Sequence, residues 1–135
     1  FEGIPTSQAR TKEEKKSMEW LNFHSFKGNY LQEIQKTFTN YKRVKIIKGE
    51  VPKILENIQI EKISFISMDM NNAFAEIKCI EYFWDKIVKH GVVLLDDYAY
   101  SAQFKEQKKS WDEFAKEKNI EILTLPTGQG LLIKY

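Results

Sequence analysis

The stretch GVVLLDDYAY, Gly91 to Tyr100, joins four consecutive apolar residues directly to two adjacent aspartates. An uninterrupted apolar run of this length is typical of a strand that is buried on both faces of a parallel sheet. Gly91 precedes the run, in the position where a glycine commonly ends a helix. Asp96 and Asp97 therefore place a doubled negative charge at the carboxyl end of the predicted strand.

The residues before this stretch predict a second strand and the helix that joins the two. KISFISM, Lys62 to Met68, is rich in β-branched and aromatic residues and predicts a strand that ends at Asp69. An amphipathic helix is expected over residues 73–89, with Glu76 among the charged residues off its apolar face. His90 then falls at the end of this helix, where a cationic imidazole would favour the helix dipole. The apolar face comprises Phe74, Ile77, Ile80, Trp84, Ile87 and Val88.

Elements on either side of this unit continue the alternation of helices and strands. Capping residues, prolines and apolar spacing predict helices over residues 11–21, 29–40, 52–55 and 103–118. Apolar runs predict strands over residues 44–47, 120–125 and 131–135, the last two joined by the turn PTGQG. The pattern indicates an α/β fold with a mostly parallel sheet and a C-terminal antiparallel hairpin.

Length and composition exclude several classes of protein. The 135 residues fit one domain, and a formal net charge of +2 with mixed lysines and glutamates gives no indication of a nucleic-acid partner. No apolar run approaches the ~20 residues of a membrane span, and no signal peptide opens the sequence, so a cytoplasmic protein is expected. The single cysteine, Cys79, is interpreted as a small core residue.

The acidic strand ends predict a metal site. If the two strands are neighbours, they lie ~4.8 Å apart and bring Asp69, Asp96 and Asp97 to one edge of the sheet. Carboxylates so close repel one another, and Mg²⁺ would remove that repulsion. Helix capping or a turn is the alternative role for each aspartate. The same two alternatives, turn residue or oxygen ligand, apply to Asn71 and Asn72.

Five segments together resemble a known family. FEGIP, VKIIKG, MDMNN, LLDDYAY and LPTGQGLLIKY occur in the order and spacing found in the macrocin O-methyltransferase family, and the resemblance covers nearly the whole chain. This family comprises class I S-adenosylmethionine-dependent methyltransferases that act on sugars. The resemblance implies a Rossmann-like fold, S-adenosylmethionine and Mg²⁺ as cofactors, and a small-molecule sugar as substrate.

The resemblance also implies roles for individual residues. Asp69 would be a metal ligand and the base that accepts the proton of the sugar hydroxyl, and Asp96 and Asp97 would complete the metal site. Contacts to the methyl donor would come from Lys48, Gly49 and Met68. Contacts to the substrate would come from Asn71, Asn72 and Tyr98, although Tyr98 could equally cover the edge of the sheet.

Two features depart from the family pattern. Many members carry a second aspartate two positions after the first, and Asn71 stands there in this sequence and cannot act as a base. In addition, FEGIP resembles a segment that follows the second strand of the fold, so the glycine-rich loop of the first strand should lie upstream. We therefore expect that the sequence is part of a longer protein or that another chain fills the gap between residues 44–47 and 62–68.

Other expectations follow from the same features. The exposed strand edges beside such a gap would be prone to pairing with other chains, and we expect a homo-oligomer. The polar segment over residues 1–28 is interpreted either as a lid over the substrate or as a flexible segment.

Two other functions compete with methyl transfer. One is Mg²⁺-dependent phosphoryl transfer in a receiver-like domain, although such domains carry the doubled acid after their first strand. The other is a catalytically inert fragment or interaction module.

Overall fold

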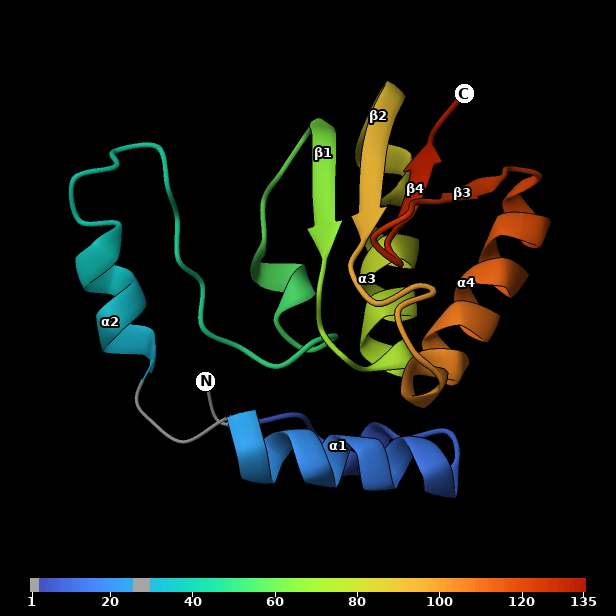
Figure 1. The fold of residues 1–135 in the computed structure, drawn as a ribbon. Coiled ribbons are helices and arrows are strands. Elements are labelled where there is room, and N and C mark those ends of the chain that lie inside the picture. The colour runs from blue at the N-terminus through green and yellow to red at the C-terminus, as the bar shows by residue number, and fades with distance from the viewer. Residues whose placement is uncertain (1–2, 26–29) are drawn as a thin grey trace.

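The computed structural model describes residues 3–25 and 30–135, which form a mixed four-stranded sheet with helices (Figure 1). The strands are β1 (Ile63–Met68), β2 (Ile87–Leu95), β3 (Ile122–Thr124) and β4 (Gly130–Ile133). The α-helices are α1 (Lys12–Ser25), α2 (Tyr30–Thr37), α3 (Ala73–Phe83) and α4 (Lys105–Lys118). Single 3₁₀ turns are η1 (Thr6–Gln8), η2 (Leu55–Asn57), η3 (Trp84–Lys86) and η4 (Ala102–Phe104).

The sheet has the order β1-β2-β4-β3 and confirms the α/β fold class. β1 and β2 are parallel neighbours joined by α3, and Met68 at the end of β1 lies opposite Leu95 at the end of β2. β4 runs antiparallel to both β2 and β3, which confirms the predicted C-terminal hairpin. Gly130, the first residue of β4, also pairs with Leu95, so the turn before β4 lies at the edge where β2 ends.

The joining helix ends earlier than its apolar spacing predicts. α3 stops at Phe83 and a 3₁₀ turn leads into β2 at Ile87, whose side chain is buried and whose backbone pairs with Ile63. The predicted helix over residues 73–89 is therefore too long, because the chain enters the sheet at Ile87, which pairs with Ile63. Lys134 Nζ donates to the carbonyls of Trp84 and Ile87, at 2.7 and 2.9 Å, where the helix gives way to the strand.

His90 and Gly91 accordingly lie inside β2, and their predicted role at a helix end is wrong. His90 has a left-handed backbone conformation with φ of 64°, and its N–H donates to the carbonyl of Lys134 at 2.6 Å. A Cβ on Gly91 would lie 2.5 Å from Cγ2 of Ile87 and 2.9 Å from the carbonyl oxygen of Val88. This close approach of the backbone to itself is what requires glycine here.

The predicted strand over residues 44–47 is also wrong, because no described strand pairs with it. Val44 and Ile47 are 43% and 45% exposed. The short helix predicted over residues 52–55 is a run of turns that leads into η2.

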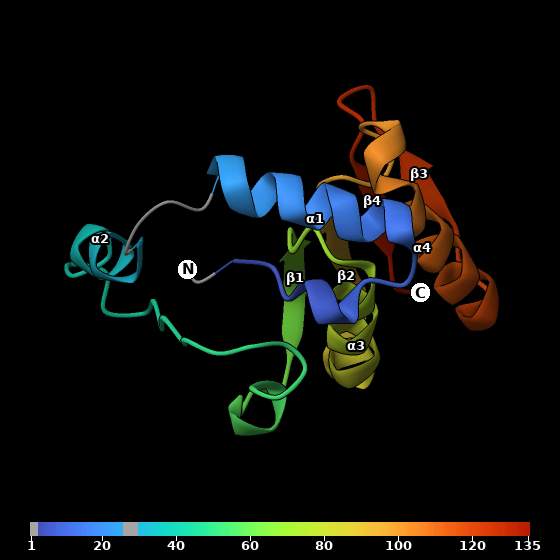
Figure 2. The ribbon, with the colours of Figure 1, turned by 90° about the horizontal axis from the view of Figure 1, so that it is seen from below.

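The amphipathic helix α2 stands apart from the sheet, as Figures 1 and 2 show, and none of its residues is buried. Asn29, its predicted N-cap, lies outside the described residues.

The core lies between one face of the sheet and helices α3 and α4. It includes Ile77, Ile80, Phe83, Val93, Leu95, Trp111, Phe114 and Leu132. On the opposite face Phe65 is 57% exposed, and Val92 and Leu94 are only half-buried. The expectation that β2 is buried on both faces is therefore wrong for the described residues, because α3 and α4 cover the same face.

Helix α1 crosses the edge of the sheet at which β1 and β2 end (Figures 1 and 2). Thr11 Oγ1 accepts from the N–H of Glu14 at 3.1 Å, as the predicted capping box requires. The buried carboxylate of Glu14 then accepts from the N–H of Arg10 at 2.6 Å and from the N–H of Ala73 at 3.1 Å. Glu14 thereby ties α1 to the first residue of α3. Within the described residues, no helix is long and apolar enough to span a membrane.

We expect Gly91→Ala to lower the free energy of unfolding by about 1–3 kcal/mol, because the added methyl group meets backbone as well as a side chain. His90→Gly is the control at the next position. Glycine removes the backbone strain of a left-handed residue but raises the conformational entropy of the unfolded chain. The two effects oppose each other, so the free energy of unfolding should change by less than about 1 kcal/mol. Urea unfolding of both variants measures the two effects, and an unchanged Gly91→Ala protein would refute the close approach.

Candidate metal centre

Three aspartates meet at the carboxyl edge of the sheet. Asp69 follows β1, and Asp96 and Asp97 follow β2; one carboxylate oxygen of each lies within 4.8 Å of those of the other two. The N–H of Asp96 donates to the carbonyl of Met68 at 3.0 Å, which continues the pairing of the two strands past their ends. The structure thus brings together the three residues that the sequence singled out, and their role as metal ligands stays a prediction.

The charge of Asp96 disfavours the ionisation of the two other aspartates. Burial, followed by the charges of Asp96 and Asp69, raises the pKa of Asp97 to about 6. Burial and the charge of Asp96 also raise the pKa of Asp69, against a hydrogen bond from Asn71 that lowers it. A cation bound between the oxygens would remove this repulsion, and an all-oxygen set of carboxylates suits a hard cation such as Mg²⁺. The donor set therefore fits the metal that the sequence predicts.

Gln129 is a site residue that the sequence analysis missed. Its side-chain Nε2 donates to Oδ1 of Asp96 at 2.8 Å. Its backbone carbonyl accepts from the N–H of Leu125 at 2.8 Å in the turn before β4. The sequence feature that could have identified Gln129 is the predicted antiparallel hairpin. Because β4 begins beside the end of β2, the PTGQG turn has to lie at the same edge as the aspartates.

Asn71 and Asn72 shape the loop that carries Asp69. Asn71 has a left-handed conformation with φ of 51°, and its Nδ2 donates to Oδ1 of Asp69 at 3.1 Å. Asn72 is 1% exposed and caps α3, since its Oδ1 accepts from the N–H of Ala75 at 3.1 Å. Its Nδ2 donates to Oε1 of Gln8 at 2.7 Å. Asn71 is thus a turn residue and Asn72 a helix cap, and the contact of either with a substrate stays a prediction.

Tyr98 is directed toward α4. Its side chain is buried, its hydroxyl donates to Oδ1 of Asp112, and Lys108 Nζ donates to that hydroxyl at 3.2 Å. A Cβ on Gly130 would lie 2.7 Å from Cγ of this ring. Tyr98 therefore packs on the start of β4, as the alternative of covering the sheet edge predicts, and its contact with a substrate stays a prediction.

The three candidates for contact with the methyl donor do not form a pocket of their own. Met68 is buried in the core. A Cβ on Gly49 would lie 2.4 Å from Cγ1 of Ile54, so packing within the chain accounts for this glycine. Lys48 is exposed on the segment before it. These residues show no cradle fitted to a cofactor, and their role stays a prediction.

Glu76 was expected on the solvent side of α3, and this expectation is wrong. The residue is 3% exposed, and burial raises the pKa of its carboxyl to about 7 against hydrogen bonds from Trp111, Gln107 and Met70 that lower it. The helical spacing could have predicted the burial of Glu76, because this residue falls on the same face as Ala73, Ile77 and Ile80.

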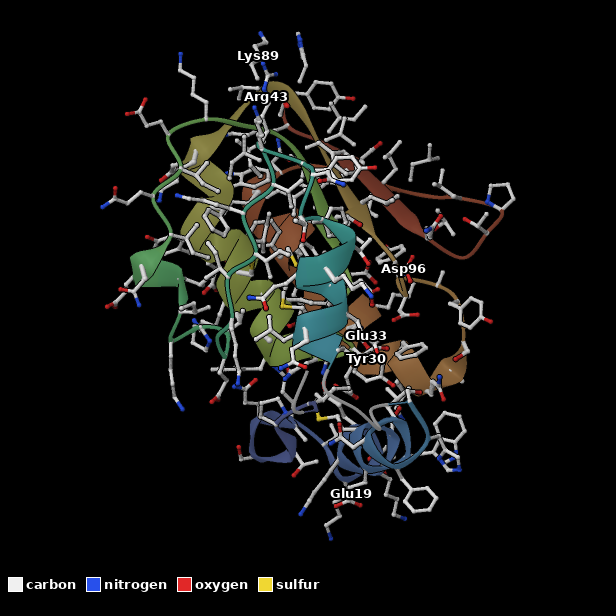
Figure 3. All side chains as sticks on the ribbon, turned by 90° about the vertical axis from the view of Figure 1, so that its left-hand side faces the viewer. Glu19, Tyr30, Glu33, Arg43, Lys89 and Asp96 are labelled. Carbon is white, nitrogen blue, oxygen red and sulfur yellow. The ribbon has the colours of Figure 1, made fainter. Side chains whose placement is uncertain are left out.

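Two shallow hollows of the surface lie away from the three aspartates. One runs along α4 beside Lys108 and Asp112, and the other lies between α1 and the start of α4. Neither is lined by an aspartate of the candidate centre. Asp96 itself lies on the loop after β2, as Figure 3 shows from the side of α2.

The raised pKa of Asp97 predicts a pH-dependent stability. Because the folded pKa of about 6 exceeds the ordinary 3.8, the neutral group contributes stability below about pH 4 that is lost as the pH rises through 6. Without divalent cations, the stability of Asp97→Asn relative to the wild type should therefore increase as the pH rises from 4.5 to 7.5. Thermal unfolding in EDTA measures this gain, with Asp85→Asn, an exposed residue of η3, as the control. An equal difference in stability at pH 4.5 and pH 7.5 would contradict the raised pKa of Asp97.

Comparison with known proteins places the fold and the family. The family described as Macrocin-O-methyltransferase (TylF) matches the sequence over residues 1–124. A solved structure titled "Structure of the O-methyltransferase NovP" has the same fold, with a TM-score of 0.73 and 17% sequence identity; the match covers 98% of this chain and 56% of that one. This chain thus spans little more than half the length of that relative. A search of curated proteins found no match. On the family match, the chain belongs to the macrocin O-methyltransferase family.

Proposed function

We propose that this chain is the metal-binding part of an O-methyltransferase that uses S-adenosylmethionine and Mg²⁺ to methylate a hydroxyl of a small-molecule sugar. Membership of the family supports the reaction class. The observation that carries the proposal is the convergence of Asp69, Asp96 and Asp97 to within 4.8 Å at the edge of the sheet where α/β proteins bind their ligands.

The three aspartates differ in a way that fits a shared metal centre. Gln129 donates to the carboxylate of Asp96 and orients it, and Asp97 is half-buried, which supports both as proposed ligands. Asp69 is the exposed member of the three and the one most open to an incoming substrate. When bound, a divalent cation would hold oxygens of the acceptor and lower the pKa of the reacting hydroxyl.

Asp69 is the proposed acceptor of the hydroxyl proton. Its pKa is raised by burial and by Asp96, which makes it a better base than an isolated aspartate. Asn71 donates to one of its oxygens at 3.1 Å and leaves the other for a proton or a metal ion. An amide cannot accept the proton in place of the carboxylate, so the position of Asn71 concentrates this role on Asp69.

The use of S-adenosylmethionine is proposed on the family alone. Lys48, Gly49 and Met68 show no cofactor cradle among the described residues, and no step through the methyl donor is derived from them. The edge of β1 opposite β2 has no strand partner within residues 3–25 and 30–135. We propose that further strands, from the same polypeptide or from a second copy, cover this edge in the working enzyme.

The position of Lys134 argues against phosphoryl transfer in a receiver-like domain. Such a domain requires a lysine at a later strand end on the acidic edge, whereas Lys134, after β4, lies at the opposite edge beside the start of β2. The doubled aspartate also follows β2 and not the first strand.

The metal site is tested by calorimetric titration of the protein with Mg²⁺ and with S-adenosylhomocysteine. Asp96→Ala and Asp97→Ala should each abolish measurable Mg²⁺ binding and the methylation of sugars, because each removes one of three ligands. Glu61→Ala, an exposed acid before β1, is the matched control and should bind normally. Activity that survives both aspartate substitutions would refute the metal role, and a wild type that binds neither ligand would favour the inert alternative.

A further inference from the structure

Glu76 is a buried carboxylate to which no role has been assigned so far. It is the fourth residue of α3, and both of its oxygens accept hydrogen bonds. Oε1 accepts from the N–H of Met70 at 3.3 Å and from Nε2 of Gln107 at 3.1 Å, and Oε2 accepts from Nε1 of Trp111 at 2.8 Å. Glu76 thus connects the loop after β1 with two side chains of α4.

The pairing of buried donors alone does not explain an acid at this position. An ionised carboxylate is costly to bury unless its partners compensate, and a neutral amide oxygen could also accept from Trp111 and Gln107. The first turn of a helix favours a negative charge, but an exposed acid would serve that purpose equally well. What distinguishes Glu76 is its bond to the backbone of Met70, the residue that directly follows Asp69.

The loop over residues 69–72 is held from three sides. Glu76 binds the N–H of Met70 from α3, and Gln8 binds the side chain of Asn72 from η1. Glu14 binds the N–H of Ala73 from α1, immediately after the loop. Of these three tethers, the one from Glu76 lies nearest to Asp69 along the chain, and it fixes the peptide that follows the candidate ligand.

We propose that Glu76 is a positioning residue that holds the Met70 peptide, and through it the carboxylate of Asp69, in the geometry required for a divalent cation. This inference rests on the proposed metal site. Mutation of a group that orients a metal ligand typically costs about 10–100-fold in metal affinity. The contribution of Glu76 is therefore to affinity and geometry at the metal, and Glu76 itself does not contact the metal.

Two variants separate this role from a mere contribution of negative charge. Glu76→Asp keeps the charge but shortens the side chain by one methylene, so its carboxylate withdraws from Met70. Glu76→Gln keeps the length and removes the charge. If Glu76 acted only as a negative charge near Asp97, Glu76→Asp would bind Mg²⁺ normally and Glu76→Gln would not. Positioning predicts the reverse order, with weaker binding for Glu76→Asp than for Glu76→Gln, whose side-chain oxygen can still accept from the N–H of Met70.

The experiment measures Mg²⁺ affinity by calorimetry and the electron paramagnetic resonance spectrum of bound Mn²⁺, with hydrogen exchange at the Met70 amide as a metal-independent readout. Glu81→Asp, an exposed glutamate of the same helix, is the matched control. We expect Glu76→Asp to weaken Mg²⁺ binding about tenfold, to alter the Mn²⁺ spectrum and to speed exchange at Met70, while Glu81→Asp changes none of these. If Glu76→Asp does not fold, Trp111→Phe serves instead, because it frees Oε2 and should shift the same readouts in the same direction.

The outcomes distinguish the inference from the proposed function. A folded Glu76→Asp protein with wild-type Mg²⁺ affinity and an unchanged Mn²⁺ spectrum would overturn the role of Glu76 alone. Unchanged metal binding in Trp111→Phe would do the same. A wild-type protein that binds neither Mg²⁺ nor Mn²⁺ would overturn the metal site itself, and the role of Glu76 with it.

Discussion

The parallel pairing of β1 with β2 is the constraint on which the candidate site depends. Met68 lies opposite Leu95, so the two strands end together, and the N–H of Asp96 bonds back to the carbonyl of Met68. A shift of one residue in this register would separate the acidic ends and turn the alternate side chains of a strand to the other face. Between Ile87, which pairs with Ile63, and Val92, which pairs with Phe65, the register shifts, and the left-handed residue His90 lies within this irregular part of β2.

The loop after β1 is held by several buried polar groups. Glu14, Asn72 and Glu76 are each nearly inaccessible to solvent, and each makes a hydrogen bond within the loop or at the helix start that follows it. Among the described residues, no buried side-chain nitrogen or oxygen lacks a hydrogen-bond partner. Because burying such groups costs stability unless all are paired, their concentration around four residues fits a loop whose position matters for function.

The central unit of the fold and the acidic cluster could be predicted from the sequence, because both depend on local signals. The apolar run before Asp96, the β-rich run before Asp69 and the intervening helix identify a parallel pair whose ends must meet. The helix boundary and the unpaired residues 44–47 could not be predicted, since pairing partners decide them. Ile87 pairs with Ile63 of β1 and so belongs to a strand, whereas Val44 has no strand partner among the described residues. Gln129 and Glu76 were missed because each acts across the fold, one through an antiparallel hairpin and the other through α4.

Whether a divalent cation binds between Asp69, Asp96 and Asp97 decides between a metal centre and a set of turn residues. A crystal structure of the protein grown with Mn²⁺, with anomalous scattering measured at the manganese edge, addresses it directly. An anomalous peak about 2.1 Å from carboxylate oxygens of Asp69, Asp96 and Asp97 is the predicted result. A structure in which these oxygens have no anomalous peak between them, at Mn²⁺ concentrations that saturate binding, would contradict the metal centre.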